Sequence, residues 1–255
     1  MENRNNSNNN NNASNANNAS NRKKRLILIG GGGHCKSVLD SALAMNTFAE
    51  IVITDPQLRA GTEILGCKVV GNDNLLSELI NTGEFTDAFV TVGSVGSIES
   101  VSLRKKLVRM AKQLGFKFPI IIDPTACVSQ TASIGAGTFV GKHAVINAES
   151  VIGFHCIINS GAIIEHECSV GDFSHVSVGA VLCGDSHIGA ECFIGAGSTV
   201  IQQINIGDRC IVGANSTVLN NLEDDMKVLG INSIKVTPPP PKIVENINYI
   251  SAHAA

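Results

Sequence analysis

The sequence lacks a long apolar run and carries little net charge. No apolar stretch approaches the roughly 20 residues that a membrane-spanning helix needs. The formal net charge is −3 and the pI is about 6.2, which argues against a nucleic-acid or an anionic-membrane partner. Residues 1–21 are dominated by Asn and Ser and have no apolar centre of the kind that a signal peptide carries. These absences favour a soluble, cytoplasmic protein.

Paired CxxC spacing is also missing, although the chain has eight Cys. Without such spacing neither a thiolate metal site nor a disulfide framework is indicated, so we expect no metal. A reducing compartment fits this usage. Some of these Cys recur in the small-residue slot of a repeat, where a thiol acts as a compact apolar filler: Cys156, Cys168, Cys192 and Cys210.

Length and composition divide the 255 residues into two ordered domains and two tails. We expect a disordered Asn-rich tail over residues 1–23, because that segment has almost no apolar surface to bury. An α/β domain should follow over 24–123 and a repeat domain over 124–236. A Pro-containing tail over 237–255 completes the chain, and its Pro238–Pro241 run predicts an extended polyproline segment.

A six-residue repeat runs without a break from Val128 to Thr217. Each hexad opens with an aliphatic residue, and a small residue follows four positions later, with Ile204 as the one departure. Stacked aliphatic side chains bury a ladder core, while small residues and Gly let the chain turn sharply. The pattern predicts a left-handed parallel β-helix of roughly five coils, spaced about 4.8 Å apart. A hexad β-helix of this kind resembles the hexapeptide acyltransferase family, which implies acyl transfer, and a passive spacer is the alternative.

The segment before the repeat alternates short apolar runs with helical spacing. We expect strands at 25–29, 51–54, 68–70, 88–92 and 119–122, and helices at 35–45, 75–80 and 103–114. This alternation favours a small Rossmann-like parallel sheet with helices on both faces. The ligand crevice of such a sheet lies at the carboxyl ends of its strands.

A glycine turn, Gly30–Gly33, joins the first expected strand to the first helix. Cys35 stands where a dinucleotide fingerprint needs its third Gly, so a redox dinucleotide is not indicated. Backbone N–H groups at a helix start still suit a phosphate or pyrophosphate, and a tight turn without a ligand is the alternative. Asp55 ends the next strand and could accept hydrogen bonds from a ribose or a base, or could merely form a turn before a proline.

Two His residues of the repeat lie in strings that suit acid–base chemistry. His166 is flanked by Glu165 and Glu167, and His175 follows in a Phe-Ser-His-Val-Ser-Val-Gly-Ala string. An imidazole that acts as a base needs an orienting partner, which either Glu could supply. Adjacent strand residues point to opposite faces, so the sequence does not establish the contact, and a solvated polar corner is the alternative. We expect surface or structural roles for the other His residues of the repeat, which are His143, His155 and His187.

These features together resemble the sialic acid O-acetyltransferase NeuD family. The resemblance lies in the glycine-turn-plus-His string at 30–34, the small α/β domain, Glu-His-Glu-Cys at 165–168, and Gly-Asp-Phe-Ser-His-Val-Ser-Val-Gly-Ala at 171–180. Within the family the chain is most similar to the PglD-type branch, which N-acetylates nucleotide-linked 4-amino-4,6-dideoxy sugars. The resemblance covers roughly residues 24–236. It implies a homotrimer, acetyl-CoA bound between neighbouring β-helices, and the nucleotide-linked amino sugar, with UDP expected, on the N-terminal domain.

The resemblance also implies roles for single residues. The general base falls on His166 and its following carboxylate on Glu167. On the cofactor side, His175 falls near the acetyl group and the backbone N–H of Gly184 falls near the thioester. The main chain at Ala196 and Ala214 falls where the family contacts pantetheine. On the substrate side, the nucleotide contacts fall on Gly32, His34 and Asp55. Asn159 falls on a position near the sugar. Many relatives end the last coil with Gly-x-Pro-Ala-Lys, which is Gly-Ile-Asn-Ser-Ile-Lys here at 230–235, so the adenine end of CoA has no assignment.

This reading implies direct attack of a sugar amine on the thioester, with His166 as proton acceptor. A Cys nucleophile at Cys168 or Cys183 is the alternative chemistry, although neither has a basic partner in sequence. Other acceptors remain open: a hydroxyl of a sialic-acid-like sugar, or a GDP-linked amino sugar. A γ-type zinc carbonic anhydrase is a remote alternative, with its ligands drawn from His143, His155, His166 and His175, and so is a non-catalytic scaffold.

Overall fold

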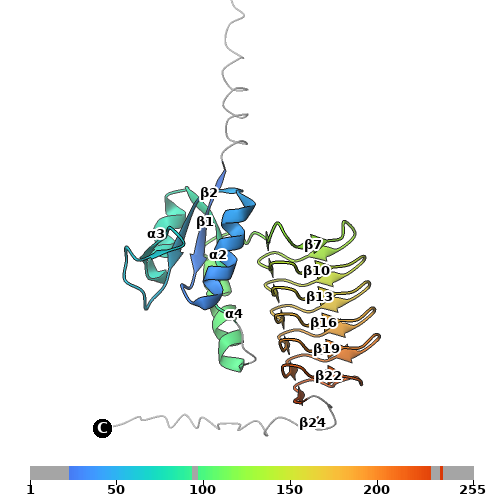
Figure 1. Cartoon of the computed structure of the whole chain (residues 1–255). Helices are drawn as coiled ribbons and strands as arrows, with labels where there is room; N and C mark the ends of the chain where they lie inside the picture. The colour runs from blue at the N-terminus through green and yellow to red at the C-terminus, as the bar shows by residue number, and fades with distance from the viewer. Residues whose placement is uncertain (1–22, 94–96, 231–235, 238–255) are drawn as a thin grey trace, which may run out of the picture.

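A computed structural model describes residues 23–93, 97–230 and 236–237 of the chain. The Asn-rich segment 1–21 and the Pro238–Pro241 run lie outside the described residues. An α/β domain stands beside a column of stacked short strands (Figure 1). None of the described helices is long and apolar enough to cross a membrane.

The N-terminal domain is built on a five-stranded sheet in the order β3-β4-β2-β1-β5. Its strands are β1 (Lys24–Ile29), β2 (Phe48–Thr54), β3 (Glu63–Ile64), β4 (Cys67–Gly71) and β5 (Phe85–Val90). All pairs are parallel except β3 with β4, so the expected parallel sheet has an unpredicted antiparallel edge. Helix α2 (Gly33–Met45) packs on one face, and α3 (Leu76–Asn81), preceded by the short η1 (Asp73–Leu75), and α4 (Ile98–Gln113) pack on the other.

The alternating side chains of β1 explain these two layers. Leu26 and Leu28 enter the core beneath α2, whereas Ile27 and Ile29 enter the core beneath α4. Strand β1 lies between β2 and β5 and ends at the glycine turn. The chain reverses its direction across the sheet at β1, so the carboxyl ends of β1 and β5 form the crevice where such sheets bind ligands.

The hexads form a left-handed parallel β-helix with three flat faces. Face I contains β6 (Ile121–Ile122), β9 (Phe139–Val140), β12 (Ile157–Ile158), β15 (His175–Val176), β18 (Phe193–Ile194), β21 (Ile211–Val212), β23 (Lys227–Val228) and the antiparallel β24 (Val236–Thr237). Face II contains β7 (Cys127–Val128), β10 (Val145–Ile146), β13 (Ile163–Ile164), β16 (Val181–Leu182), β19 (Thr199–Val200) and β22 (Thr217–Val218). Face III contains β8 (Ser133–Ile134), β11 (Val151–Ile152), β14 (Ser169–Val170), β17 (His187–Ile188) and β20 (Asn205–Ile206). The chain passes from face I to II to III, and we name the corners I/II, II/III and III/I.

The interior of the β-helix confirms the repeat pattern. The second residue of each two-residue strand points inward, and Val140, Ile158 and Ile164 are fully buried. The Cys of the small-residue slot are buried with them, which confirms their role as apolar fillers: Cys156, Cys168, Cys192 and Cys210. All eight Cys are free thiols.

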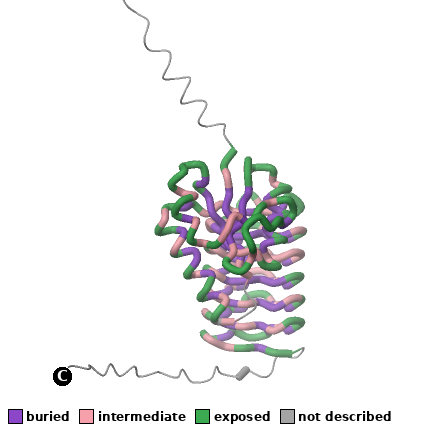
Figure 2. Tube along the Cα trace, turned by 90° about the vertical axis from the view of Figure 1, so that its left-hand side faces the viewer, coloured by how far each residue is buried: buried purple, intermediate pink, exposed green. Residues whose placement is uncertain are grey.

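The first residue of each strand points outward, and the three faces differ there. On face I, Phe139, Ile157 and His175 are buried beneath the N-terminal domain. Face II presents an apolar row that the described domain does not cover, made of half-buried Val145, Ile163 and Val181. Face III is mainly polar, with Ser169, His187 and Asn205 in one row. Figure 2 shows buried segments both in the N-terminal domain and along the coils of the β-helix.

One expected strand belongs elsewhere. The run at 119–122 was expected to complete the N-terminal sheet, but β6 pairs with β9 in face I, so that expectation is wrong. Residues Ile121 and Phe139 instead share a core with α2. The sequence of an apolar dipeptide does not indicate whether it pairs in the N-terminal sheet or in face I, because both sheets bury the same kinds of side chain.

Candidate active site

The II/III corner of the third coil carries the predicted base. Nδ1 of His166 lies 2.9 Å from Oε2 of Glu167, and both side chains are 58% exposed. Glu167 has a left-handed backbone, with φ of 61°, which turns its carboxylate back toward the preceding imidazole. A carboxylate that accepts from Nδ1–H leaves the lone pair on Nε2 as the basic site.

Gly184 lies directly beneath this imidazole, one coil further along the same corner. A Cβ atom placed on Gly184 would lie 2.7 Å from both Cε1 and Nε2 of His166. Across the described residues, the N–H of Gly184 donates no hydrogen bond, while its carbonyl accepts one from Gln203. The corner therefore places the backbone N–H of Gly184, which has no acceptor among the described residues, close to Nε2 of His166.

A second group of predicted residues lies on face I and the I/II corner. His175 is 6% exposed, and its Nε2 lies 3.2 Å from Nδ2 of Asn159. Oδ1 of Asn159 accepts from the N–H of Ser160 at 2.8 Å, which directs the amide N–H toward the imidazole. The His175 ring also packs edge-on against Phe193, with centroids 5.2 Å apart. Ala196 and Ala214 follow in the same corner column as Ser160, and neither N–H donates a hydrogen bond within the described chain.

The glycine turn brings His34 to this second group. Helix α2 begins after Gly32 without a side-chain cap, so its first N–H groups remain available to a ligand. The His34 ring packs edge-on against Phe139, and its buried Nε2 has no hydrogen-bond partner among the described residues. Burial, with smaller contributions from the nearby His175 and Arg104, lowers the pKa of His34 to about 3. His34 is therefore neutral at physiological pH and can meet a ligand as a hydrogen-bonding group, not as a cation.

Asp55 closes the glycine turn in this structure. Its Oδ2 accepts from the N–H of Gly31 at 2.7 Å, and its Oδ1 accepts from Gln57 and Leu58 at 2.8 and 3.0 Å. Gly31 is packed so closely that an added Cβ would lie 2.5 Å from Leu58. These contacts support the turn-forming interpretation, and a contact of Asp55 with a nucleotide stays a prediction.

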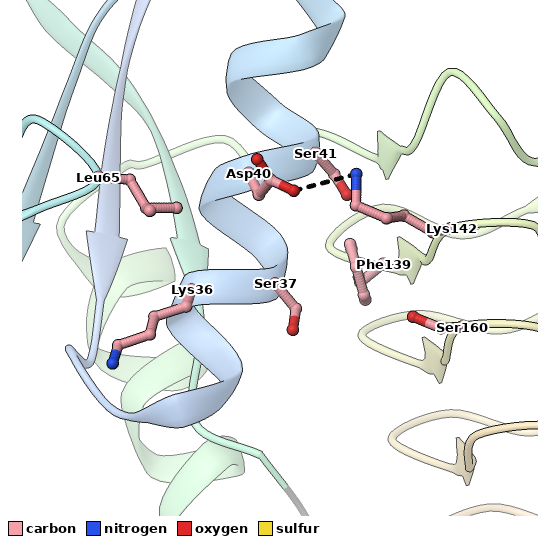
Figure 3. Close-up of a pocket in the computed structure, with 8 residues that line it drawn as sticks. All are labelled: Lys36, Ser37, Asp40, Ser41, Leu65, Phe139, Lys142 and Ser160. Atoms are coloured by element: carbon pink, nitrogen blue, oxygen red, sulfur yellow. Dashed lines mark ion pairs between the residues drawn. The ribbon is translucent and has the colours of Figure 1, made fainter.

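A cavity of about 340 Å³ opens between α2 and the two I/II corners that follow β9 and β12. Its walls come from one face of α2, from Leu65, and from the β-helix: Lys36, Ser37, Asp40, Ser41, Leu65, Phe139, Lys142 and Ser160 (Figure 3). Ser160 directly follows Asn159, so the cavity lies next to the Asn159–His175 pair. It joins the glycine-turn side of the N-terminal domain to the I/II corner.

A single chain does not bring all the predicted residues together. Gly32, His34, Asn159, His175, Ala196 and Ala214 gather around face I and the I/II corner. His166, Glu167 and Gly184 lie at the II/III corner, so the width of face II separates the two groups. The other predicted His positions are scattered as well, with His143 at a I/II corner and His155 at a III/I corner. The described residues contain no group of three or more His, Cys, Asp or Glu that could hold a metal ion.

The Cys alternatives have poor chemistry for a nucleophile. Cys168 is 1% exposed, and its Sγ points to the carbonyl of Cys183 at 3.2 Å. Burial raises the pKa of the Cys183 thiol, so its thiolate is disfavoured.

Residues that sequence reasoning did not single out hold the two domains together. Arg104 of α4 is 4% exposed, and it donates to the carbonyls of Phe173 (3.2 Å) and His155 at III/I corners. Its guanidinium also packs over the Phe173 ring at 5.9 Å. Burial lowers the pKa of Arg104 to about 10. Nothing in the local sequence separates Arg104 from the other cations of its helix, because its partners are carbonyls remote in sequence.

The chain matches two family models. Residues 25–111 match the PglD N-terminal domain, and residues 185–220 match the bacterial transferase hexapeptide model. Comparison with curated proteins returned no match.

Several solved structures are similar over both domains. The acetyltransferase domain of PglB from Neisseria gonorrhoeae FA1090 is 35% identical with a TM-score of 0.75, and the match covers 85% of this chain and 100% of that one. A structure of the same domain in complex with acetyl coenzyme A is 34% identical, with a TM-score of 0.74, covering 86% and 100%. A variant of GDP-perosamine N-acetyl transferase from Caulobacter crescentus, in complex with CoA and GDP-perosamine, is 36% identical, with a TM-score of 0.76, covering 86% and 99%.

The similarity to these enzymes extends through the α/β domain and the β-helix alike. This chain is therefore an acyltransferase and belongs to the NeuD/PglD-like sugar acetyltransferases, a family of the hexapeptide acyltransferases.

Proposed function

We propose that this protein transfers the acetyl group of acetyl-CoA to the amino group of a nucleotide-linked 4-amino-4,6-dideoxy sugar, with UDP as the nucleotide. The observation that carries the proposal is the His166–Glu167 pair above the free N–H of Gly184. A base and an oxyanion donor side by side are what an amine needs to attack a thioester. The solved relatives support the substrate class, since one was solved in complex with acetyl coenzyme A and another in complex with CoA and GDP-perosamine.

The reaction follows from this pair. The neutral amine attacks the thioester carbonyl carbon, Nε2 of His166 accepts the proton that the nitrogen loses, and Glu167 stabilises the resulting imidazolium. The N–H of Gly184 donates to the oxygen that becomes negative. The C–S bond then breaks, the CoA sulfur leaves as the thiol with the proton that His166 had accepted, and the new C–N bond remains. No covalent enzyme intermediate is needed, which agrees with the unfavourable environment of Cys168 and Cys183.

We place the acceptor on the N-terminal side of the molecule. The diphosphate lies at the uncapped start of α2, around Gly32 and His34, and the sugar lies in the cavity beside Asn159. The free N–H groups of Ala196 and Ala214 suit the carbonyls of pantetheine along the same corner, and His175 lies near the acetyl group. In this arrangement Asp55 supports the nucleotide site through the shape of the glycine turn.

The two separated groups of residues make a homotrimer part of the proposal. Face II lies between the I/II and II/III corners and carries the uncovered apolar row of Val145, Ile163 and Val181. Three copies that bury this row around a threefold axis would set the His166 corner of one copy against the Asn159 corner of the next. Each active site would then be built by two copies, with acetyl-CoA between neighbouring β-helices. We also place the protein in the cytoplasm, where its eight free Cys stay reduced.

One finding favours a second nucleotide. The Caulobacter crescentus relative, which is 36% identical, was solved in complex with GDP-perosamine, so a GDP-linked amino sugar is the alternative acceptor. An O-acetyltransferase reading would instead require a hydroxyl acceptor.

A panel assay distinguishes these acceptors. The purified chain is incubated with acetyl-CoA and UDP-, GDP- or dTDP-linked amino sugars, and free CoA thiol and product mass are followed. We expect thiol release with a 4-amino sugar and an acetyl product that resists mild hydroxylamine, as an amide does. An acetyl group lost under hydroxylamine is an ester and contradicts N-acetylation.

A further inference from the structure

A buried carboxylate joins the two domains beside the cavity. Asp123 lies between β6 and β7 and is 1% exposed. Its Oδ2 accepts hydrogen bonds from Oγ of Ser41 on α2, at 2.6 Å, and from Nζ of Lys142 at the I/II corner after β9, at 3.1 Å. Its Oδ1 accepts from the N–H and Oγ1 of Thr125, at 3.0 and 2.6 Å. One side chain therefore bonds to α2, to its own β6–β7 corner and to the next I/II corner of the β-helix.

The network is ionic and its geometry is fixed. Nζ of Lys142 also lies 3.0 Å from Oδ2 of Asp40 on α2, as the dashed line in Figure 3 shows. Burial alone would raise the pKa of Asp123, but the hydrogen bonds from Ser41, Thr125 and Lys142 outweigh it and hold that pKa well below its usual range. A buried carboxylate that stays ionised is costly to leave without its donors, so these contacts resist separation.

The same residues form part of the cavity wall. Asp40, Ser41 and Lys142 line the cavity together with Phe139 and Ser160. Helix α2 supplies one wall and the β-helix supplies the opposite one (Figure 3). Asp123 bonds to Ser41 on one wall and to Lys142 on the other, so these two hydrogen bonds set the distance between the walls.

We propose that Asp123 is a positioning residue for the acceptor substrate: through Ser41 and Lys142 it fixes α2 against the I/II corner and sets the width of the sugar cavity. The inference rests on the proposed function, which places the acceptor in this cavity. Asp123 is buried and touches no substrate, so it acts only through α2 and Lys142. Acetyl-CoA, placed further along the corner and at the next copy, does not depend on this contact.

The direct test is Asp123→Asn, assayed against both substrates. The amide N–H₂ replaces one acceptor oxygen and faces the donors Ser41 and Lys142, so α2 shifts. We expect KM for the nucleotide-linked amino sugar to rise about tenfold, the effect of losing roughly one charge-assisted hydrogen bond. KM for acetyl-CoA and kcat at saturation should stay within about twofold, which separates positioning from loss of the base.

Further variants separate positioning from general destabilisation. Lys142→Met removes one of the donors to Asp123 and should raise the acceptor KM in the same way. In the Asp123→Asn/Lys142→Met variant the new amide N–H₂ no longer faces the ammonium of Lys142. The fold-increase in acceptor KM should therefore be smaller than the product of the fold-increases of the two single variants. Arg209→Met is the matched control, because it removes hydrogen bonds to Asp224 and Asp225 in the last coils, away from the cavity. Its acceptor KM should not change.

Amide hydrogen exchange measures how firmly Asp123 holds α2 against the β-helix, and it does not depend on catalysis. The N–H groups of Ile121 and Asp123 donate to the carbonyls of Thr138 and Val140, at 3.0 and 2.8 Å. Asp123→Asn should speed exchange in residues 121–126 and in α2, and Arg209→Met should not. Wild-type exchange in Asp123→Asn, or equal rises of both KM values, overturns the inference. Should the wild type acetylate no nucleotide-linked amino sugar, the proposed function fails, while the exchange result still decides whether Asp123 holds α2.

Discussion

Nδ1 of His166 lies 2.9 Å from Oε2 of Glu167, although the two residues are neighbours in the chain. Successive residues of a strand would point apart, but this pair occupies a corner, where Glu167 has φ of 61°. The contact orients the imidazole and leaves Nε2 above Gly184. This arrangement makes the pair a base with its own orienting carboxylate.

Removing the imidazole tests that role. We expect His166→Ala to lower kcat by about 10² to 10⁴, the usual range for loss of a positioned base, with little change in affinity for acetyl-CoA. Steady-state kinetics and acetyl-CoA titration measure the two quantities. His187→Ala, on face III, is the matched control and should retain turnover. Near-normal kcat in His166→Ala would assign the base elsewhere, with His175 the first candidate.

Gly184 is expected to be essential for the position of the imidazole. A methyl group there would lie 2.7 Å from Cε1 and Nε2, so Gly184→Ala must displace the ring. We expect kcat to fall by roughly tenfold or more, the scale of a misplaced catalytic group, with an unchanged melting temperature. In the His166→Ala background the same change should cost nothing further. An additional large loss in that background would show that Gly184 acts independently of His166.

The repeat made the β-helix predictable because its signal is local. The period of six assigns every inward residue and explains why Cys156 and Cys168 are buried. The His166–Glu167 contact could not be derived in the same way, since it depends on a left-handed residue at a corner whose occupant is not Gly. The sequence pattern therefore identified both residues without establishing that they touch.

Contacts between the domains could not be predicted at all. Asp123 meets Ser41 across 82 positions of sequence, and Arg104 meets carbonyls of the β-helix. The misassigned strand β6 has the same origin, because its apolar pair suits either sheet. Pairings this remote in sequence carry no periodic signal in a single chain.

The buried His34 predicts a stability change in acid. Its pKa is lowered from 6.5 to about 3, so the unfolded chain binds the proton more readily than the folded chain. The contribution of neutral His34 to the free energy of unfolding is therefore fully present above pH 6.5, and it is lost progressively as the pH falls from 6.5 toward 3. At pH 5 the loss is up to about 2 kcal/mol. Melting curves at pH 7.5 and 5 should show a smaller decrease for His34→Asn than for the wild type, and an equal decrease would contradict the buried neutral state.

The apolar row of face II predicts an assembly defect. A charge introduced by Ile163→Glu would be buried in the proposed trimer, and burying an unpaired carboxylate is costly. Light scattering should show smaller species, and activity should be lost with them. Val151→Glu is the matched control, since Val151 is 54% exposed on face III. A fully trimeric and active Ile163→Glu protein would exclude face II as the contact.

An active site shared between copies is tested most directly by mixing two inactive variants. His166→Ala damages only the II/III corner, and His175→Ala damages only the face I side. Three quarters of trimers reassembled from an equal mixture contain both variants, and each holds one intact site of three, so about one quarter of wild-type activity should return. Activity no higher than the sum of the two variants assayed separately would contradict a site built from the His166 corner of one copy and the His175 side of the next.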